Sequence, residues 1–130
     1  ILFEKNLIYS GVSIKLLLQL IPQIVKIDDE NRKQIYLDVL SDQFCLSILT
    51  SIINQPKTAV VVAKETGIPI STVYRRLQFL QENKLLKVSG GINKDGKYFI
   101  YQSKIKEVSS KFDGISTMIH VTPNLNFTIM

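Results

Sequence analysis

Residues 58–83 carry the pattern that most restricts the fold of this chain: two short helical segments joined by a glycine. The first segment begins at Thr58, and Gly67 separates it from the second. Ala63, Gly67 and Val73 have the spacing of a helix-turn-helix motif. A small residue lets two helices cross closely, a glycine accepts positive φ at the turn, and a branched apolar residue anchors the second helix. The sequence therefore predicts a helix-turn-helix.

The second helix, predicted over about residues 69–83, has two chemically different faces. The inward face is expected to hold Val73, Leu77 and Leu80, which are spaced at i, i+4 and i+7. The outward face is expected to carry hydroxyl, amide and guanidinium groups: Ser71, Thr72, Arg75, Arg76 and Gln78. Such a face is typical of a helix in the DNA major groove, where base edges present acceptors and phosphates surround them.

A β-hairpin is predicted directly after this helix. Residues 85–92 and 97–101 alternate in polarity, and a glycine stands in the turn where φ should be positive. Lys94 and Lys97 flank this turn and suit contact with phosphates. Lys84, which follows the second helix, is expected to make the same kind of contact.

The formal charge of +5 is concentrated on the segment that contains these elements. Residues 41–110 hold ten basic and five acidic side chains, whereas residues 1–40 and 111–130 each sum to zero. A basic surplus at a helix-turn-helix is expected where the motif meets phosphates.

The order of these elements resembles that of the arsenical-resistance-repressor-like winged-helix regulators, particularly those common in archaea. The resemblance covers about residues 36–103, and its most specific stretch is Ile68-Pro-Ile-Ser-Thr-Val-Tyr-Arg-Arg-Leu77. It implies a winged helix-turn-helix, with the helix over 69–83 in the major groove. The hairpin, or wing, over about residues 86–101 would then contact the flanking backbone or the minor groove.

The expected function is a sequence-specific regulator of transcription that binds double-stranded DNA. The residues expected to contact DNA are Ser71, Thr72, Tyr74, Arg75, Arg76, Gln78, Lys84, Lys94 and Lys97. For Tyr74, half-buried packing is the competing interpretation. A second hypothesis is a winged helix that binds another protein in a larger assembly, where the basic helix would dock on an acidic partner.

Three parts are expected in a mainly α chain with a β-hairpin wing, of class α+β. They are an N-terminal extension over 1–38, the winged helix-turn-helix over 39–103, and a C-terminal hairpin with a tail over 104–130. The C-terminal hairpin is predicted from Ile105 to Val121 around Asp113-Gly114, and the tail from Asn124 onward is expected to be loosely held.

The region before residue 54 is less clearly patterned. A helix is predicted over Val12–Leu20, and residues 31–39 are ambiguous between helix and strand. Ser41 is expected to cap a helix that runs through Ile53.

A homodimer is expected, because two recognition helices can read two half-sites on DNA. The apolar segment Val12–Val25 is the expected interface. The hairpin after Ile105 is the competing interface, since an edge strand is available for pairing.

Enzymatic and metal chemistry find little support in the composition. Cys45 is the single cysteine, which excludes an internal disulfide and a thiolate-rich metal site and favours an inert buried thiol in a cytoplasmic protein. His120 is the single histidine and is expected to be structural or exposed. Some members of the resembled family bind metal through a cysteine pair on the third helix or through terminal histidine and carboxylate clusters, and this sequence has neither. No enzyme activity and no cofactor are expected.

A membrane segment is not expected either. The longest uncharged stretch near the N-terminus, Leu16–Val25, is shorter than the roughly 20 residues needed to span a bilayer. Lys57 and Lys64 are expected to be solvated.

Overall fold

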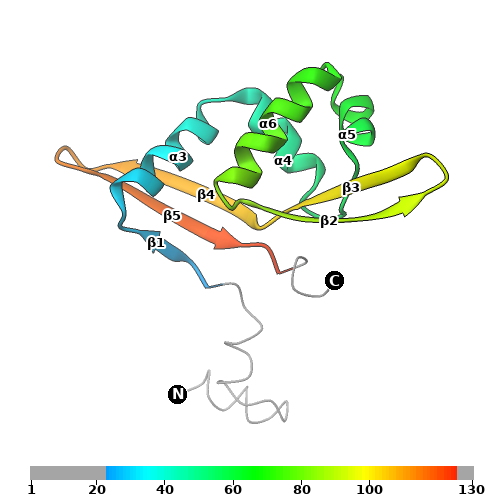
Figure 1. Cartoon of the computed structure of the whole chain (residues 1–130). Coiled ribbons are helices and arrows are strands. Elements are labelled where there is room, and N and C mark those ends of the chain that lie inside the picture. Colours follow the sequence, from blue (N-terminus) through cyan, green and yellow to red (C-terminus); the bar gives the residue numbers. More distant parts are fainter. Residues whose placement is uncertain (1–22, 126–130) are drawn as a thin grey trace, which may run out of the picture.

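The computed structural model describes residues 23–125, which form four helices and five strands of class α+β, as expected (Figure 1). The predicted helix over Val12–Leu20 lies outside the described residues. The elements are β1 (Val25–Ile27), α3 (Glu30–Leu40), α4 (Gln43–Ser51), α5 (Ala59–Thr66), α6 (Ile70–Glu82), β2 (Leu86–Asn93), β3 (Gly96–Ser103), β4 (Ile105–Phe112) and β5 (Thr117–Pro123).

Helix α3 resolves the ambiguous region in favour of a helix. The Asp29 carboxylate caps it by accepting a hydrogen bond from the Arg32 backbone N–H at 2.9 Å. The Arg32 guanidinium lies over the Tyr36 ring and donates to the Asn83 carbonyl oxygen at 2.6 Å, which ties α3 to the end of α6. The domain boundary expected at residue 38 therefore lies inside a helix that packs on its successors.

The cap of α4 is Asp42, and the prediction of Ser41 as its cap was wrong. The Asp42 carboxylate accepts from the backbone N–H groups of Phe44 and Cys45, at 2.9 and 3.2 Å. Ser41 has helical φ and ψ of −87° and −5° and ends α3 instead, whereas an N-cap needs extended backbone. The helix also ends at Ser51, two residues before the expected Ile53.

Helices α5 and α6 lie where the two helices were predicted, with Gly67 between them. The Thr58 hydroxyl accepts from the Val61 N–H at 3.3 Å and caps α5. Gly67 has φ of 75°, in the left-handed region, and its N–H donates to the Ala63 carbonyl oxygen at 2.9 Å. The predicted inward face of α6 is fully buried: Val73, Leu77 and Leu80.

The first hairpin, β2 with β3, is also confirmed. Asn93 pairs with Gly96 across the turn, and Gly96 has φ of 109° as expected. Lys57, between α4 and α5, bridges to β3, because its N–H and carbonyl both bond to the backbone of Tyr101. The first hairpin is thereby attached to the chain that leads into α5.

The second hairpin, β4 with β5, is confirmed with a longer connection than expected. Residues 113–116 form the loop, so that β5 begins at Thr117 and not at Ile115. The Asp113 carboxylate accepts from the N–H groups of Ile115 and Ser116, both at 2.8 Å. These bonds to the charged form hold the pKa of the Asp113 carboxyl below its usual value. The two hairpins project from opposite ends of the molecule (Figure 1).

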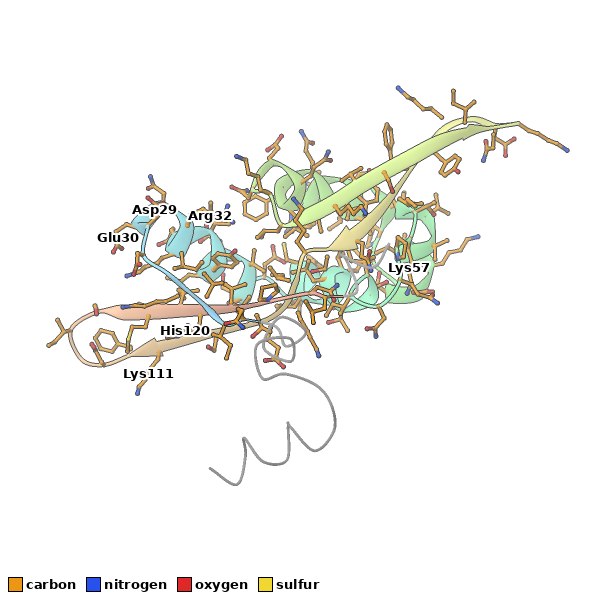
Figure 2. The ribbon with its side chains drawn as sticks, turned by 90° about the horizontal axis from the view of Figure 1, so that it is seen from below. Asp29, Glu30, Arg32, Lys57, Lys111 and His120 are labelled. Atoms are coloured by element: carbon orange, nitrogen blue, oxygen red, sulfur yellow. The ribbon has the colours of Figure 1, made fainter. Side chains whose placement is uncertain are left out.

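Strand β1 was not predicted. It pairs antiparallel with β5, so the sheet order is β1-β5-β4 and β5 is its central strand. His120 of β5 lies opposite Lys26 and Ser109, half-buried within this sheet (Figure 2). The free edge of the second hairpin is therefore β4.

One hydrophobic core joins all four helices to both sheets. Its largest fully buried apolar side chains include Ile48, Leu77 and Ile119, from α4, α6 and β5. Cys45 is buried in this core as expected, and burial, reinforced by the Asp42 charge, raises the pKa of its thiol to about 11.

Asn124, expected to begin a loosely held tail, is instead fixed in the structure. Asn124 is buried, and its side-chain amide donates to the carbonyl oxygens of Ile53 and Ser103, at 2.7 and 2.8 Å. Asn124 thus ties the end of the second hairpin to the turn after α4. The tail beyond Leu125 lies outside the described residues.

None of the helices between residues 23 and 125 has the length and apolar character that crossing a bilayer requires.

Candidate nucleic-acid interface

The outward face of α6 presents most of the predicted contact residues. The exposed ones are Ser71, Tyr74, Arg75 and Gln78, and Thr72 is half-buried. Among the ion pairs of residues 23–125, none involves Arg75. The Gln78 side-chain N–H donates to Glu82 at 3.0 Å, along the same helix face. Arg75 is therefore the side chain of α6 best placed to reach an external anion.

Arg76 does not project outward as predicted. Its Nε lies 2.7 Å from Asp42 Oδ2, without an aligned hydrogen bond, and its guanidinium lies 5.7 Å from the centre of the Phe44 ring. The side chain is only 30% exposed. Arg76 thus holds α6 against the capping residue of α4, and its position at the edge of the buried face explains the difference. We remove Arg76 from the proposed contact residues.

Tyr74 projects from α6 toward the first hairpin. It is 51% exposed, so about half of its surface is buried, as the packing interpretation expects, and the other half is accessible. Tyr101 of β3 lies nearby, and burial, with a smaller effect of Tyr74, raises the pKa of the Tyr101 hydroxyl.

The predicted lysines all lie at exposed positions. Lys84 follows α6 with φ of 62°, and Lys94 and Lys97 flank the tip of the first hairpin. The Lys97 ammonium lies 5.9 Å from the centre of the Phe99 ring, a cation–π contact.

Lys57 differs from its expected solvated state. Its ammonium pairs with the Glu65 carboxylate, and its side chain is largely buried between α5 and β3 (Figure 2). The bond from Lys57 holds the pKa of the Glu65 carboxyl below its usual value. Lys57 therefore positions the first hairpin and is not available to a ligand, whereas Lys64 is exposed as expected.

A concave surface lies between α5, α6 and the first hairpin. Its volume is about 470 Å³, and its lining includes Val60 of α5, Tyr74 of α6, and Lys97 and Phe99 of β3. It thus brings predicted contact residues from α6 and from the hairpin to one surface. Asp95, in the hairpin turn, is the only carboxylate in this lining.

Sequence reasoning missed two exposed apolar residues of the first hairpin, Ile92 and Phe99. The signal that could have identified them is their placement on the two predicted strands next to Lys97, two residues from it or opposite it. Both were interpreted only as strand-forming residues.

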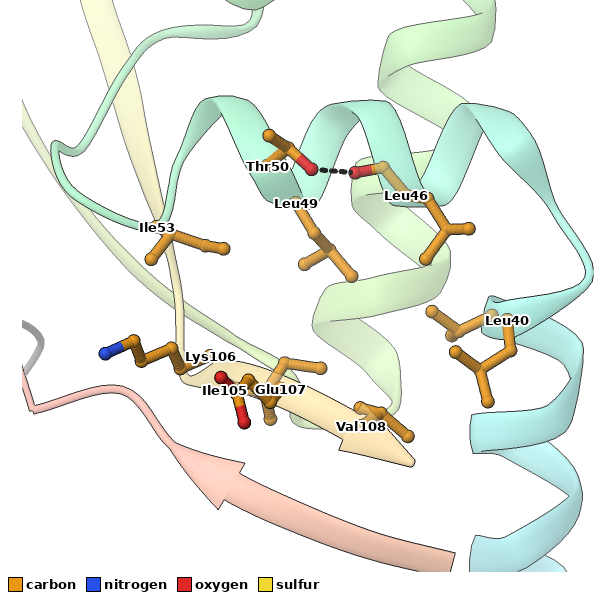
Figure 3. A pocket seen from close by; sticks show the side chains of 10 residues that line it. Leu40, Leu46, Leu49, Thr50, Ile53, Ile105, Lys106, Glu107 and Val108 are labelled. Carbon is orange, nitrogen blue, oxygen red and sulfur yellow. Dashed lines mark hydrogen bonds between the residues drawn. The ribbon is translucent and has the colours of Figure 1, made fainter. Parts of the chain in front are cut away.

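Another cavity lies between α4 and the edge strand β4 (Figure 3). Its volume is about 140 Å³, and side chains such as Leu46, Leu49 and Val108 make it mostly apolar. Thr50 contributes a hydroxyl that already donates to the Leu46 carbonyl oxygen at 2.8 Å. The lining also includes two charged side chains, Lys106 and Glu107, which are neighbours in β4 (Figure 3). Within residues 23–125, no three histidine, cysteine or carboxylate side chains gather closely enough to hold a metal ion.

Comparison with known proteins found no matching family model, curated protein or solved structure.

Proposed function

We propose that this protein is a sequence-specific DNA-binding regulator of transcription with a winged helix-turn-helix fold. In this proposal α6 is the recognition helix in the major groove, and the first hairpin is the wing. The observation that carries it is the concave surface lined by both Tyr74 of α6 and Lys97 of the hairpin, together with the exposed Arg75, which follows Tyr74 in α6. An exposed arginine on a helix, with lysines on a neighbouring hairpin, suits a protein that contacts base edges in a groove and the phosphates beside it.

Each part of this surface has a distinct role in the proposal. Ser71 and Thr72, in the first turn of α6, contact phosphates together with backbone N–H groups there. Arg75 forms bidentate bonds with a guanine edge. Lys94 and Lys97 contact the flanking phosphates, and Lys84 does so at the other end of α6.

A salt titration of duplex binding tests the proposal. Binding sequences are first selected from random duplex DNA, and affinity is then measured at rising salt concentration. We expect affinity to fall steeply, with a logarithmic slope of about −0.9 for each neutralised phosphate. The absence of duplex binding at low salt would contradict the proposal.

That outcome would favour the second hypothesis, a winged helix that binds another protein. The observation in its favour is the apolar tip of the second hairpin, where Phe112 and Ile115 are exposed.

Replacing Lys94 and Lys97 by alanine should weaken binding to all duplexes alike. Because lysine ammonium groups contact phosphates, the slope of log affinity against log salt should become shallower by about 2. The ratio of specific to random affinity should stay the same. Lys111→Ala on β4 is the matched control, since Lys111 is an exposed lysine on the other hairpin, at the opposite end of the molecule. A loss confined to one base pair would mean that the hairpin lysines read bases.

We also propose that the regulator is a homodimer that uses its N-terminal segment. The predicted interface over Val12–Val25 lies largely outside the described residues, but Val25 itself belongs to β1, which is paired with β5. A deletion should therefore stop at residue 22 to leave β1 intact. We expect the full chain to have the mass of a dimer in solution and the truncated chain that of a monomer.

Two outcomes of this mass measurement would contradict the N-terminal interface. A truncated chain that stays dimeric would instead support pairing through β4, the free edge of the second hairpin. A full chain that is monomeric at micromolar concentration would exclude the homodimer.

A further inference from the structure

The tip of the first hairpin combines an exposed apolar side chain with two lysines. Ile92, the penultimate residue of β2, is 83% exposed. It lies directly opposite Lys97, and Lys94 follows in the turn. With the half-exposed Phe99, Ile92 forms an apolar patch beside these two cations, and Asp95 is the carboxylate in the same turn. A ligand with an apolar interior and an anionic border would accommodate Ile92 and the two lysines together.

The register of the hairpin gives this tip a continuous apolar face. Directly opposed residues of an antiparallel pair share a face, so Ile92 and Lys97 lie on the same face as the pairs Gly90–Phe99 and Val88–Tyr101. This face becomes more exposed toward the tip: Tyr101 is buried, Phe99 is 48% exposed, and Ile92 is almost fully exposed. Lys97, Phe99 and Tyr101 of this face line the concave surface next to Tyr74 of α6, whereas Ile92 lines a separate hollow that it shares with Lys97 and Phe99.

The hairpin is built to hold this face in place. A side-chain carbon at Gly90 would collide with the Tyr98 carbonyl oxygen and lie 3.3 Å from the Phe99 ring, so glycine lets β3 and this ring approach β2 closely. At the base, the backbone bridge between Lys57 and Tyr101 fixes β3 to the start of α5. Ile92 is also β-branched, so few rotamers are lost when it is confined. The hairpin that carries Ile92 is therefore attached to the part of the molecule that contains α6.

We propose that Ile92 inserts as a wedge between two base pairs of duplex DNA from the minor groove, and so kinks the DNA. This inference rests on the proposed function and adds a site to it: the ligand is a base-pair step. Lys94 and Lys97 contact the phosphates on either side of the groove, and the Phe99 ring packs behind Ile92 against the sugars. Apolar wedges flanked by basic residues unstack a step and bend the duplex toward the major groove.

The wedge also predicts a sequence preference at a position where no base edge is read. Pyrimidine–purine steps such as TA and CA unstack most easily. The DNA sites that this protein selects should therefore contain such a step at a fixed distance from the base pair that Arg75 contacts. The step should lie where the hairpin tip enters the minor groove.

Bending of a selected duplex, labelled with a donor and an acceptor dye at its two ends, tests this inference. We expect the full protein to bring the ends together by a bend of about 20–90°. Ile92→Ala should abolish this bend and weaken binding by about tenfold, because the smaller side chain buries less apolar surface and cannot hold the step open. Ile115→Ala is the matched control, since Ile115 is 91% exposed in the loop of the other hairpin. It should leave both the bend and the affinity unchanged.

The outcomes separate this inference from the proposed function. A protein that binds selected duplexes without bending them, or an Ile92→Ala variant that bends them as strongly as the parent, overturns the wedge and leaves the regulator intact. A protein that does not bind duplex DNA overturns both. If Ile92→Ala changes the mass of the protein in solution and not the bend, the tip is a protein interface and the wedge is wrong.

Discussion

Arg75→Ala should remove sequence selectivity while the protein stays folded. The preference for a selected duplex over a random one should fall by about one to two orders of magnitude, since a bidentate arginine–guanine contact contributes about 1–3 kcal/mol of discrimination. Arg75 is exposed on α6, so its removal should change the free energy of unfolding by less than about 0.5 kcal/mol. Competition binding and thermal unfolding measure the two effects.

Arg76→Ala is the matched control, because Arg76 follows in sequence but pairs with Asp42. We expect it to lower the free energy of unfolding by about 1 kcal/mol, through the lost ion pair and the lost contact with the Phe44 ring. Its selectivity for the selected duplex should be retained. If Arg76→Ala abolished selectivity and Arg75→Ala did not, the assignment of the recognition face would be wrong.

Gly67→Val should damage the fold itself. Gly67 has φ of 75°, a left-handed conformation that costs an ordinary residue roughly 1–2 kcal/mol and a β-branched residue more. We expect the free energy of unfolding to fall by about 2 kcal/mol or more and Tm by about 10 °C. Chemical denaturation and a thermal melt measure these changes.

Gly67→Asn provides the control for this strain. A Cβ at Gly67 meets no atom within 4 Å, so any loss of stability comes from the backbone and not from a clash. Asparagine tolerates the left-handed region better than valine, so Gly67→Asn should lose less than half as much stability. Equal losses for both variants would point to an effect other than backbone strain, and an unchanged Tm for Gly67→Val would contradict the prediction.

The features that could be predicted from sequence are those with a local cause. Thr58 and Gly67 mark the two ends of α5 through bonds to residues three and four positions away. The spacing of Val73, Leu77 and Leu80 defines the buried face of α6 without reference to the rest of the chain. Both hairpins follow from strand alternation and a glycine in the turn, which is also information within a few residues.

Two of the missed features, the cap at Asp42 and the loop closed by Asp113, are local, whereas the others depend on partners distant in sequence. Strand β1 has three residues, too few for an alternating pattern, and it is a strand only because β5 lies beside it. Arg76 was placed outward because Asp42, its partner, belongs to another helix. Asn124 resembled a tail residue until its amide was seen to bond to Ile53 and Ser103. In the candidate site, α6 and the hairpin lysines were therefore predicted, but their shared concave surface was not.

The pairing of β1 with β5 has a consequence for how the chain folds during synthesis. Val25 pairs with Val121, so β1 cannot form its strand pairing until β5, far along the sequence, has been synthesised. The contacts of α4, α5, α6 and the first hairpin are much closer in sequence, and the entropy lost in closing their loops is correspondingly smaller. We therefore expect these elements to form on the ribosome first. In this order of assembly, β1 docks late, after β5 has been made.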